Sequence, residues 1–198
     1  MFIYPSPLNP GILRPFMFGI LMLFSIAGFA QTEKPVESRT ITKKIEDSSI
    51  TFRLSNLIAR QTPELGADTQ VNVTTVNGVV LLTGSVESAQ AKEQVESLVE
   101  EHPYVRKVVN EIRVEKSRSP LVLGRDKILQ MSVKHRISRE LKKNSPTVHV
   151  VVYRKTVYLM GVVSEEVAEQ AAKIAQNTRR SERVITVFEL KTVEESQT

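Results

Sequence analysis

The chain of 198 residues contains no cysteine and no tryptophan. The absence of cysteine excludes disulfides, thiolate metal sites, a cysteine nucleophile and a lipid carried on a cysteine. Histidine is also rare: His102, His135 and His149 fall on a predicted loop, helix and strand, without the spacing of metal ligands. The sequence has no Gly-rich phosphate loop, nucleophile elbow or paired-carboxylate motif. We therefore expect no catalytic residue, metal, cofactor or small-molecule substrate; the alternative is an enzyme whose active site has no recognisable motif.

Long apolar runs are absent except near the N-terminus, where Arg14 precedes an uncharged and mostly apolar stretch over residues 16–30. This stretch is short for a transmembrane helix, which needs roughly 20 consecutive apolar residues. It ends in Gly28-Phe29-Ala30, whose small residues suit signal peptidase. We expect residues 1–30 to be a signal peptide cleaved between Ala30 and Gln31, which places the mature protein in the periplasm. The alternative is an uncleaved membrane anchor.

The next segment, residues 31–44, is polar and charged without any periodicity, and it is predicted to be a flexible tether. An amphipathic helix should follow, with Ser48 or Ser49 as its N-cap and its end before Pro63. Its apolar positions recur at helical spacing and predict one buried side: Ile50, Leu54, Leu57 and Ile58.

A hairpin, a second helix and a third strand complete this unit. Valine- and leucine-rich stretches over residues 71–73 and 79–83 flank Asn77-Gly78, which is a typical two-residue hairpin turn. Ser88 can N-cap the second helix, and residues 108–114 alternate as a strand. The tight turn makes the first two strands antiparallel, whereas the helical connection makes the second and third parallel.

The same order of elements then occurs a second time. Val148 matches Val71 and Gly161 matches Gly84, an offset of 77 residues in both cases. The chain is therefore predicted to be an α+β (α/β) protein of two αββαβ modules, each with a three-stranded mixed sheet and two helices on one face. The predicted boundaries are residues 45–115 and 125–192 for the modules, 116–124 for a linker and 193–198 for a tail.

The two modules carry opposite net charge. Residues 45–115 contain six Lys and Arg against eleven Asp and Glu, a net charge of −5, whereas residues 125–191 contain fourteen against seven, a net charge of +7. Much of the positive charge lies on one predicted helix, opposite its apolar stripe of Val133, Ile137 and Leu141 at 100° per residue. The basic residues of this helix are Lys134, His135, Arg139, Lys142 and Lys143, with Arg136 nearer the edge of the stripe. The surface is either a solvated helix face or a binding site for an anionic partner.

Each module resembles a BON domain, over roughly residues 45–192. The resemblance rests on several stretches taken together: Val71-Asn72-Val73-Thr74 with the run from Asn77 to Gly84, Val109-Asn110-Glu111-Ile112-Arg113, and the run from Val157 to Glu165. It implies a non-enzymatic periplasmic protein, peripheral at the outer membrane, that supports envelope integrity under stress. The implied partners are an anionic phospholipid surface, bound through the second module, and outer-membrane assembly proteins.

On this interpretation the basic helix is the lipid-binding site, and Ile128, Leu129 and Met131 add apolar contact with the bilayer. Tandem BON proteins of this type carry a lipobox cysteine in the signal and a tryptophan near the start of this helix. Phe29 and Ser132 stand at those positions here. A lipid anchor is therefore not expected.

The sequence also fits two other functional classes. One is a periplasmic protein scaffold or a stress-induced chaperone-like protein without direct lipid binding, in which the acidic module meets a partner or the basic module itself. The other is nucleic-acid binding, suggested by a sequence pI near 9.5. The export signal and the absence of aromatic residues among the basic ones on the helix argue against nucleic acid.

The N-terminal sequence generates a first prediction. Cleavage after Ala30 should leave Gln31 as the first residue, and the mature protein should carry no acyl chain because no cysteine is present. Intact mass and N-terminal sequencing of protein purified from cells would test this. A retained Met1, or a mass that includes a lipid, would contradict it.

Overall fold

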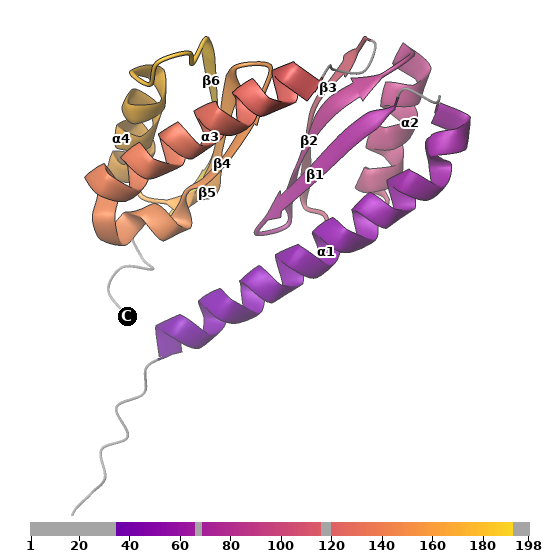
Figure 1. The fold of residues 1–198 in the computed structure, drawn as a ribbon. Coiled ribbons are helices and arrows are strands. Elements are labelled where there is room, and N and C mark those ends of the chain that lie inside the picture. The colour runs from indigo at the N-terminus through magenta and orange to yellow at the C-terminus, as the bar shows by residue number, and fades with distance from the viewer. Residues whose placement is uncertain (1–34, 66–68, 116–119, 192–198) are drawn as a thin grey trace, which may run out of the picture. The chain divides into compact units, whose positions relative to one another are not determined.

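The structure is a computed structural model that describes residues 35–65, 69–115 and 120–191 (Figure 1). The predicted signal peptide with its cleavage site at Ala30 and Gln31, and the predicted tail over residues 193–198, lie outside the described residues. The elements in chain order are α1 (Pro35–Leu65), β1 (Gln70–Val76), β2 (Val79–Val86), α2 (Ala89–Glu100), β3 (Lys107–Val114), α3 (Pro120–Leu141), the 3-10 helix η1 (Lys142–Thr147), β4 (His149–Tyr153), β5 (Thr156–Val163), α4 (Glu165–Gln176) and β6 (Arg183–Leu190).

The strands form two three-stranded mixed sheets, with the order β1-β2-β3 in the first module and β4-β5-β6 in the second. The hairpin pairs are antiparallel, with Val73 opposite Leu82 in one sheet and Val150 opposite Leu159 in the other. The pairs joined through a helix are parallel, β2 with β3 and β5 with β6. The predicted repeat, strand order and strand directions are therefore confirmed.

Each module has a core between its sheet and its two helices. Leu54 and Ile58 of α1 and Val95 of α2 are buried against Val80 and Leu82 of β2. The second module repeats this arrangement with the buried residues of α3, α4 and β5. Ser88 is the N-cap of α2, as predicted, and its Oγ accepts a hydrogen bond from the backbone N of Ala91 at 3.1 Å.

A third apolar cluster lies on the sheet faces that the helices leave uncovered, and it joins the two modules. Its buried members come from β2, β4 and β5: Val79, Leu81, Tyr153, Tyr158 and Met160. Because β2 and β5 are covered on both faces, nearly all of their residues are buried, which explains their continuous apolar sequences. A module of this size has only a marginal core by itself, and packing the sheets together buries further apolar surface.

Two helices begin earlier than predicted. The first begins at Pro35, so it includes residues 35–44, which were assigned to a tether, and Ser48 lies inside it with its Oγ donating to the carbonyl oxygen of Lys44 at 2.8 Å. Once the buried part of a helix has formed, adding a further residue at its end costs little free energy, so the helix can extend into polar sequence. The apolar periodicity marks only the buried part and therefore underestimates the length of the helix. The other begins at Pro120, within the predicted linker 116–124, and proline is favourable as the first residue of a helix.

Gly84 and Gly161, which the repeat relates to each other, both lie where the backbone of another segment approaches very closely. A Cβ at Gly84 would lie 1.9 Å from the carbonyl oxygen of Gln70, and one at Gly161 would lie 2.1 Å from that of Thr147. Their φ angles of 141° and 152° are also unfavourable for any residue with a side chain. The glycine two residues before the end of the second strand of each module is thus required by the close approach of the backbone.

Alanine at either position should therefore destabilise the protein by about 3 kcal/mol or more, because both the backbone angle and the contact are unfavourable. Chemical denaturation of Gly84→Ala and Gly161→Ala would measure the effect. Gly124→Ala is the matched control, since a Cβ at Gly124 of α3 meets nothing within 4 Å. That control should stabilise by up to about 1 kcal/mol, because alanine is the better helix former. Equal stability of all three variants would contradict the argument.

Candidate functional site

Helix α3 carries most of the residues that the sequence analysis assigned to a binding surface. Its inner side is fixed by the buried side chains of Leu129, Val133, Ile137 and Leu141, which belong to the core of the second module. This packing fixes the rotation of the helix about its axis and so determines which residues face away from the protein.

The outward face of α3 combines basic and apolar side chains. Lys134, His135, Arg139 and Lys142 are exposed on it, Lys142 being the first residue of η1. The side chain of Lys143 lies outside the described part. Arg136 differs, because its guanidinium donates to the carbonyl oxygen of Asn177 at 2.7 Å and pairs with Glu140 at 3.4 Å, so it is partly engaged with the end of α4.

Of the three apolar residues predicted to contact a bilayer, two have exposed side chains and one is buried. Ile128 is 57 % exposed and Met131 is 62 % exposed. Leu129 is only 2 % exposed, so its assignment to the binding surface is wrong: at helical spacing it shares the inner stripe with Val133. Leu121, which is 75 % exposed near the start of α3, was missed because the sequence analysis placed it in the linker.

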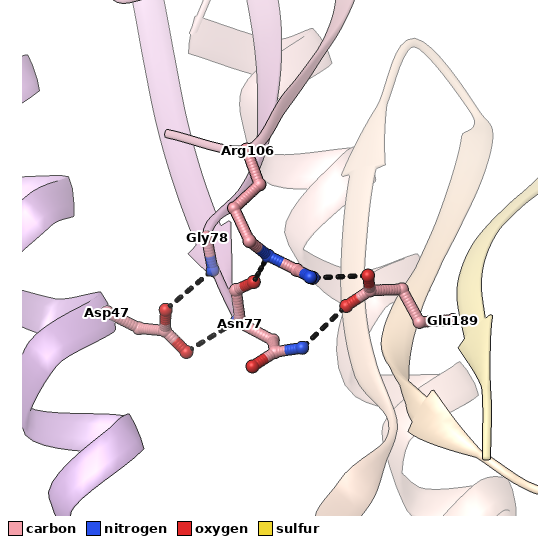
Figure 2. Close-up of polar contacts among 5 residues, drawn as sticks. All are labelled: Asp47, Asn77, Gly78, Arg106 and Glu189. Atoms are coloured by element: carbon pink, nitrogen blue, oxygen red, sulfur yellow. Dashed lines mark hydrogen bonds and ion pairs between the residues drawn. The ribbon is translucent and has the colours of Figure 1, made fainter. Parts of the chain in front are cut away.

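An aspartate in the first helix of each module binds the amides of the adjacent hairpin turn, which sequence reasoning also missed. The Asp47 carboxylate accepts from the backbone N of Asn77 at 2.7 Å and of Gly78 at 3.1 Å, as Figure 2 shows. In the second module Asp126 accepts from Arg154 at 2.8 Å and from Lys155 at 3.0 Å. The similar positions of the two aspartates, 79 residues apart in the sequence, are the signal that could have revealed them.

Polar contacts also join the modules at the edge of the shared apolar cluster. Glu189 of β6 accepts from Asn77 Nδ2 at 2.7 Å and pairs with Arg106 (Figure 2). A second ion pair has the charges reversed between the modules: Glu115 of the first module pairs with Arg154 of the second at 2.5 Å. Each module therefore contributes one basic and one acidic residue to these two ion pairs.

Tyr158 lies in the apolar cluster and donates to Glu111 Oε2 at 3.2 Å. Burial raises the pKa of this phenol well above its usual range, and the nearby Glu111 carboxylate raises it further. The Tyr158 hydroxyl is therefore a hydrogen-bond donor throughout the physiological pH range, and its contact with Glu111 helps to fix the two sheets together.

The described residues offer no metal site and no membrane-spanning segment. No group of three or more His, Asp and Glu side chains comes together among residues 35–65, 69–115 and 120–191. None of the helices in these ranges combines the length and the apolar character needed to cross a bilayer.

The BON domain family matches residues 46–116 and 125–192, which is more than half of the sequence. The chain therefore belongs to the BON domain family, and it contains two BON domains in tandem. This result confirms the resemblance found in the sequence.

Two relatives place the chain more closely. It is 27% identical over 173 residues to the outer membrane lipoprotein DolP of Haemophilus influenzae, covering 87% of this chain and 89% of that one. It is 25% identical over 155 residues to the 21 kDa hemolysin of Actinobacillus pleuropneumoniae, covering 78% and 79% of the two chains. A solved structure of CdsD, a structural protein of the type III secretion system of Chlamydia trachomatis, is 14% identical with a TM-score of 0.26, covering 73% of this chain and 95% of that one, which is too low to support an argument. The chain is thus a tandem BON-domain protein similar to DolP.

The surroundings of His149, the first residue of β4, generate a prediction for pH. Although His149 is exposed, the protein around it removes part of the water from its imidazole and so lowers the pKa; the nearby Lys44 and Lys134 lower it further, against an opposing effect of Asp47. Because the folded pKa lies below the unfolded value of 6.5, the unfolded chain takes up the proton first as the pH falls. The contribution of His149 to stability is therefore present above about pH 6.5 and lost below it.

Replacing His149 with Gln should reduce the loss of thermal stability between pH 7.5 and pH 5.5. Melting curves at both pH values would measure it, with His135→Gln on the outward face of α3 as the matched control. If His149→Gln and wild type lose stability equally over this range, the desolvation of the imidazole has no consequence for folding.

Proposed function

We propose that this protein is a non-enzymatic envelope protein of the periplasm that binds anionic phospholipid surfaces through the outward face of α3 and supports outer-membrane integrity. The observation that carries the proposal is the juxtaposition on one helix face of exposed apolar side chains, Ile128 and Met131, with the exposed basic side chains that follow them. Such a face suits the boundary between headgroups and acyl chains.

The charge of the helix supports this assignment. The acidic residues of α3 are Asp126, which is buried on the hairpin turn, and Glu140, which pairs with Arg136. Neither carboxylate therefore opposes an anionic surface as an unpaired charge at the outward face. Basic side chains close to an anionic leaflet contribute about 1 kcal/mol each, so Lys134, Arg139 and Lys142 together provide several kcal/mol.

The relatives support an envelope location, since one of them is named an outer membrane lipoprotein. The present chain has no cysteine to carry a lipid. Contact with a membrane would therefore depend on the protein surface, and the apolar residues Leu121, Ile128 and Met131 give α3 the means to add hydrophobic contact to the electrostatic attraction.

The test is the triple variant Lys134→Glu, Arg139→Glu and Lys142→Glu, which changes the charge of the face by −6. Co-sedimentation with phosphatidylglycerol vesicles at low and physiological salt should fall at least tenfold relative to wild type, because the attraction is replaced by repulsion. Folding should be retained, since all three side chains are exposed. Thermal melts would verify this.

The matched control is Arg53→Glu, Arg60→Glu and Lys107→Glu, which makes the same change of charge at exposed positions of α1 and β3. It should keep most of the vesicle binding. Equal loss in both variants would show a nonspecific effect of net charge, and unchanged binding by the folded α3 variant would contradict the site. Wild-type binding that ignores the anionic lipid content would instead favour the protein scaffold.

A further inference from the structure

Three basic side chains from three segments of the second module line one hollow in its surface. The hollow measures about 320 Å³ and is lined by Arg125 of α3, Lys155 of the β4–β5 turn, Arg180 of the loop between α4 and β6, and Leu129 at its apolar side. Its lining shares no residue with the basic outward face of α3. The two sites are therefore separate features of the module.

Hydrogen bonds to the backbone of Lys155 hold the three segments in place. Asp126, next to Arg125, accepts from the amide of Lys155 at 3.0 Å. The amide of Glu182 donates to the carbonyl oxygen of Lys155 at 3.1 Å, which ties the turn to the loop that contains Arg180. The three segments are thus tied together by contacts that do not involve the side chains of Arg125, Lys155 and Arg180.

Two of these cations occupy backbone positions that favour glycine. Lys155 has a φ of 59° and Arg180 a φ of 75°, both in the left-handed region. The residue equivalent to Lys155 in the first module is Gly78, with a φ of 74°. Residues with a Cβ are unfavourable at such positions and are characteristic of functional sites, so basic residues are present here against the conformational preference of the backbone.

The hollow has a net positive charge. The side chains of Arg125 and Arg180 have no hydrogen bond or ion pair with any residue that the structure describes, whereas Lys155 pairs with Glu182. With the Glu182 carboxylate on Lys155 and the Asp126 carboxylate on the amide of Lys155 both counted, the three cations leave an excess of one positive charge. Two unpaired guanidinium groups beside one hollow are well suited to a planar or tetrahedral oxyanion, which arginine binds through two parallel N–H groups.

The equivalent hollow of the first module shows that the fold does not require these charges. Glu46, Gly78 and Tyr104 stand at the positions of Arg125, Lys155 and Arg180, and they line a hollow of about 500 Å³. Matching hydrogen bonds establish which residues of the two modules are equivalent. The amide of Arg106 donates to the carbonyl oxygen of Gly78 at 2.8 Å, and the amide of Glu182 donates to the carbonyl oxygen of Lys155 in the same way. At these three equivalent positions the second module has three cations and the first has one carboxylate, whereas the cations of the first hollow, Lys43, Arg53 and Arg106, lie elsewhere in its lining.

We propose that the hollow formed by Arg125, Lys155 and Arg180 is a binding site for a phosphate group. The group would belong to a phospholipid headgroup or to a soluble phosphate ester. The site goes beyond the outward face of α3, because it recognises an individual phosphate group and does not require a membrane surface.

The test is an NMR titration of the chain from Gln31 to Thr198 with inorganic phosphate, glycerol 1-phosphate and dihexanoylphosphatidylglycerol below its micelle concentration. Amide shifts at Lys155 and Arg180 should change in a saturable manner, at constant ionic strength maintained with sodium chloride. Saturation by the short-chain lipid alone assigns the site to a lipid headgroup, and saturation by the two soluble phosphates assigns it to soluble phosphate.

The variant Arg125→Glu, Lys155→Gly and Arg180→Tyr replaces each cation with the residue of the first module, so the backbone frame should be retained. Its affinity for phosphate should fall at least tenfold. The triple variant of the outward face, Lys134→Glu with Arg139→Glu and Lys142→Glu, is the control: it changes the charge by −6 instead of −4 but should keep phosphate binding. The same control separates this proposal from vesicle binding through α3.

Three results would overturn the proposal. The first is the absence of saturable shifts with all three phosphate compounds. The second is an equal loss of affinity in the control variant, which would indicate general attraction of anions. The third is unchanged affinity in a variant that lacks all three cations and still gives a dispersed amide spectrum.

Discussion

The contact between the two sheets determines what the rest of the molecule can do. Each module covers one face of its sheet with helices, and the other face bears apolar side chains such as Leu81, Tyr158 and Met160. Because these faces cover each other, neither sheet face remains for a ligand. Binding surfaces must therefore lie on the outer sides of the helices and on the loops, where the charged residues of the second module are found.

The aspartate that binds each hairpin turn explains how the two modules keep one fold while their surfaces differ. Asn77-Gly78 forms a two-residue turn readily, whereas Arg154-Lys155 has poor intrinsic preference for positive φ angles at both positions. The Asp126 carboxylate accepts from both amides of the less favourable turn and compensates for its sequence. A turn supported in this way can carry basic side chains that a free hairpin would disfavour.

Much of the fold follows from local sequence. The valine-rich strands, the Asn77-Gly78 turn, the Ser88 cap and the offset of 77 residues predict the element order, the strand directions and the repeat, because each depends on neighbouring residues. The extent of α1 and α3 was underestimated, since the end of a helix beyond its buried part has no apolar period. Leu129 was misplaced because it is next to Ile128 in the sequence, although one residue of an α-helix turns the side chain by about 100°, here from the exposed side to the core.

The hollow lined by Arg125, Lys155 and Arg180 could not be predicted from the sequence. These residues are far apart in the sequence and only the tertiary structure brings them together. A net charge of +7 over residues 125–191 fits either a solvated surface or an anionic partner, and it gives no position for a binding site. Because the chain is a repeat, the two modules can be compared position by position. This comparison identifies basic residues of the second module that have no basic equivalent in the first.

Because the two sheets belong to one chain, their pairing does not depend on the concentration of the protein. The interface built around Tyr153 and Tyr158 resembles in composition the contact between two separate subunits, but both halves belong to one chain. Their effective concentration is then fixed by the connecting segment, on the order of millimolar for a short one, whatever the abundance of the protein. The paired state should therefore persist at high dilution, where a dimer of single modules would dissociate.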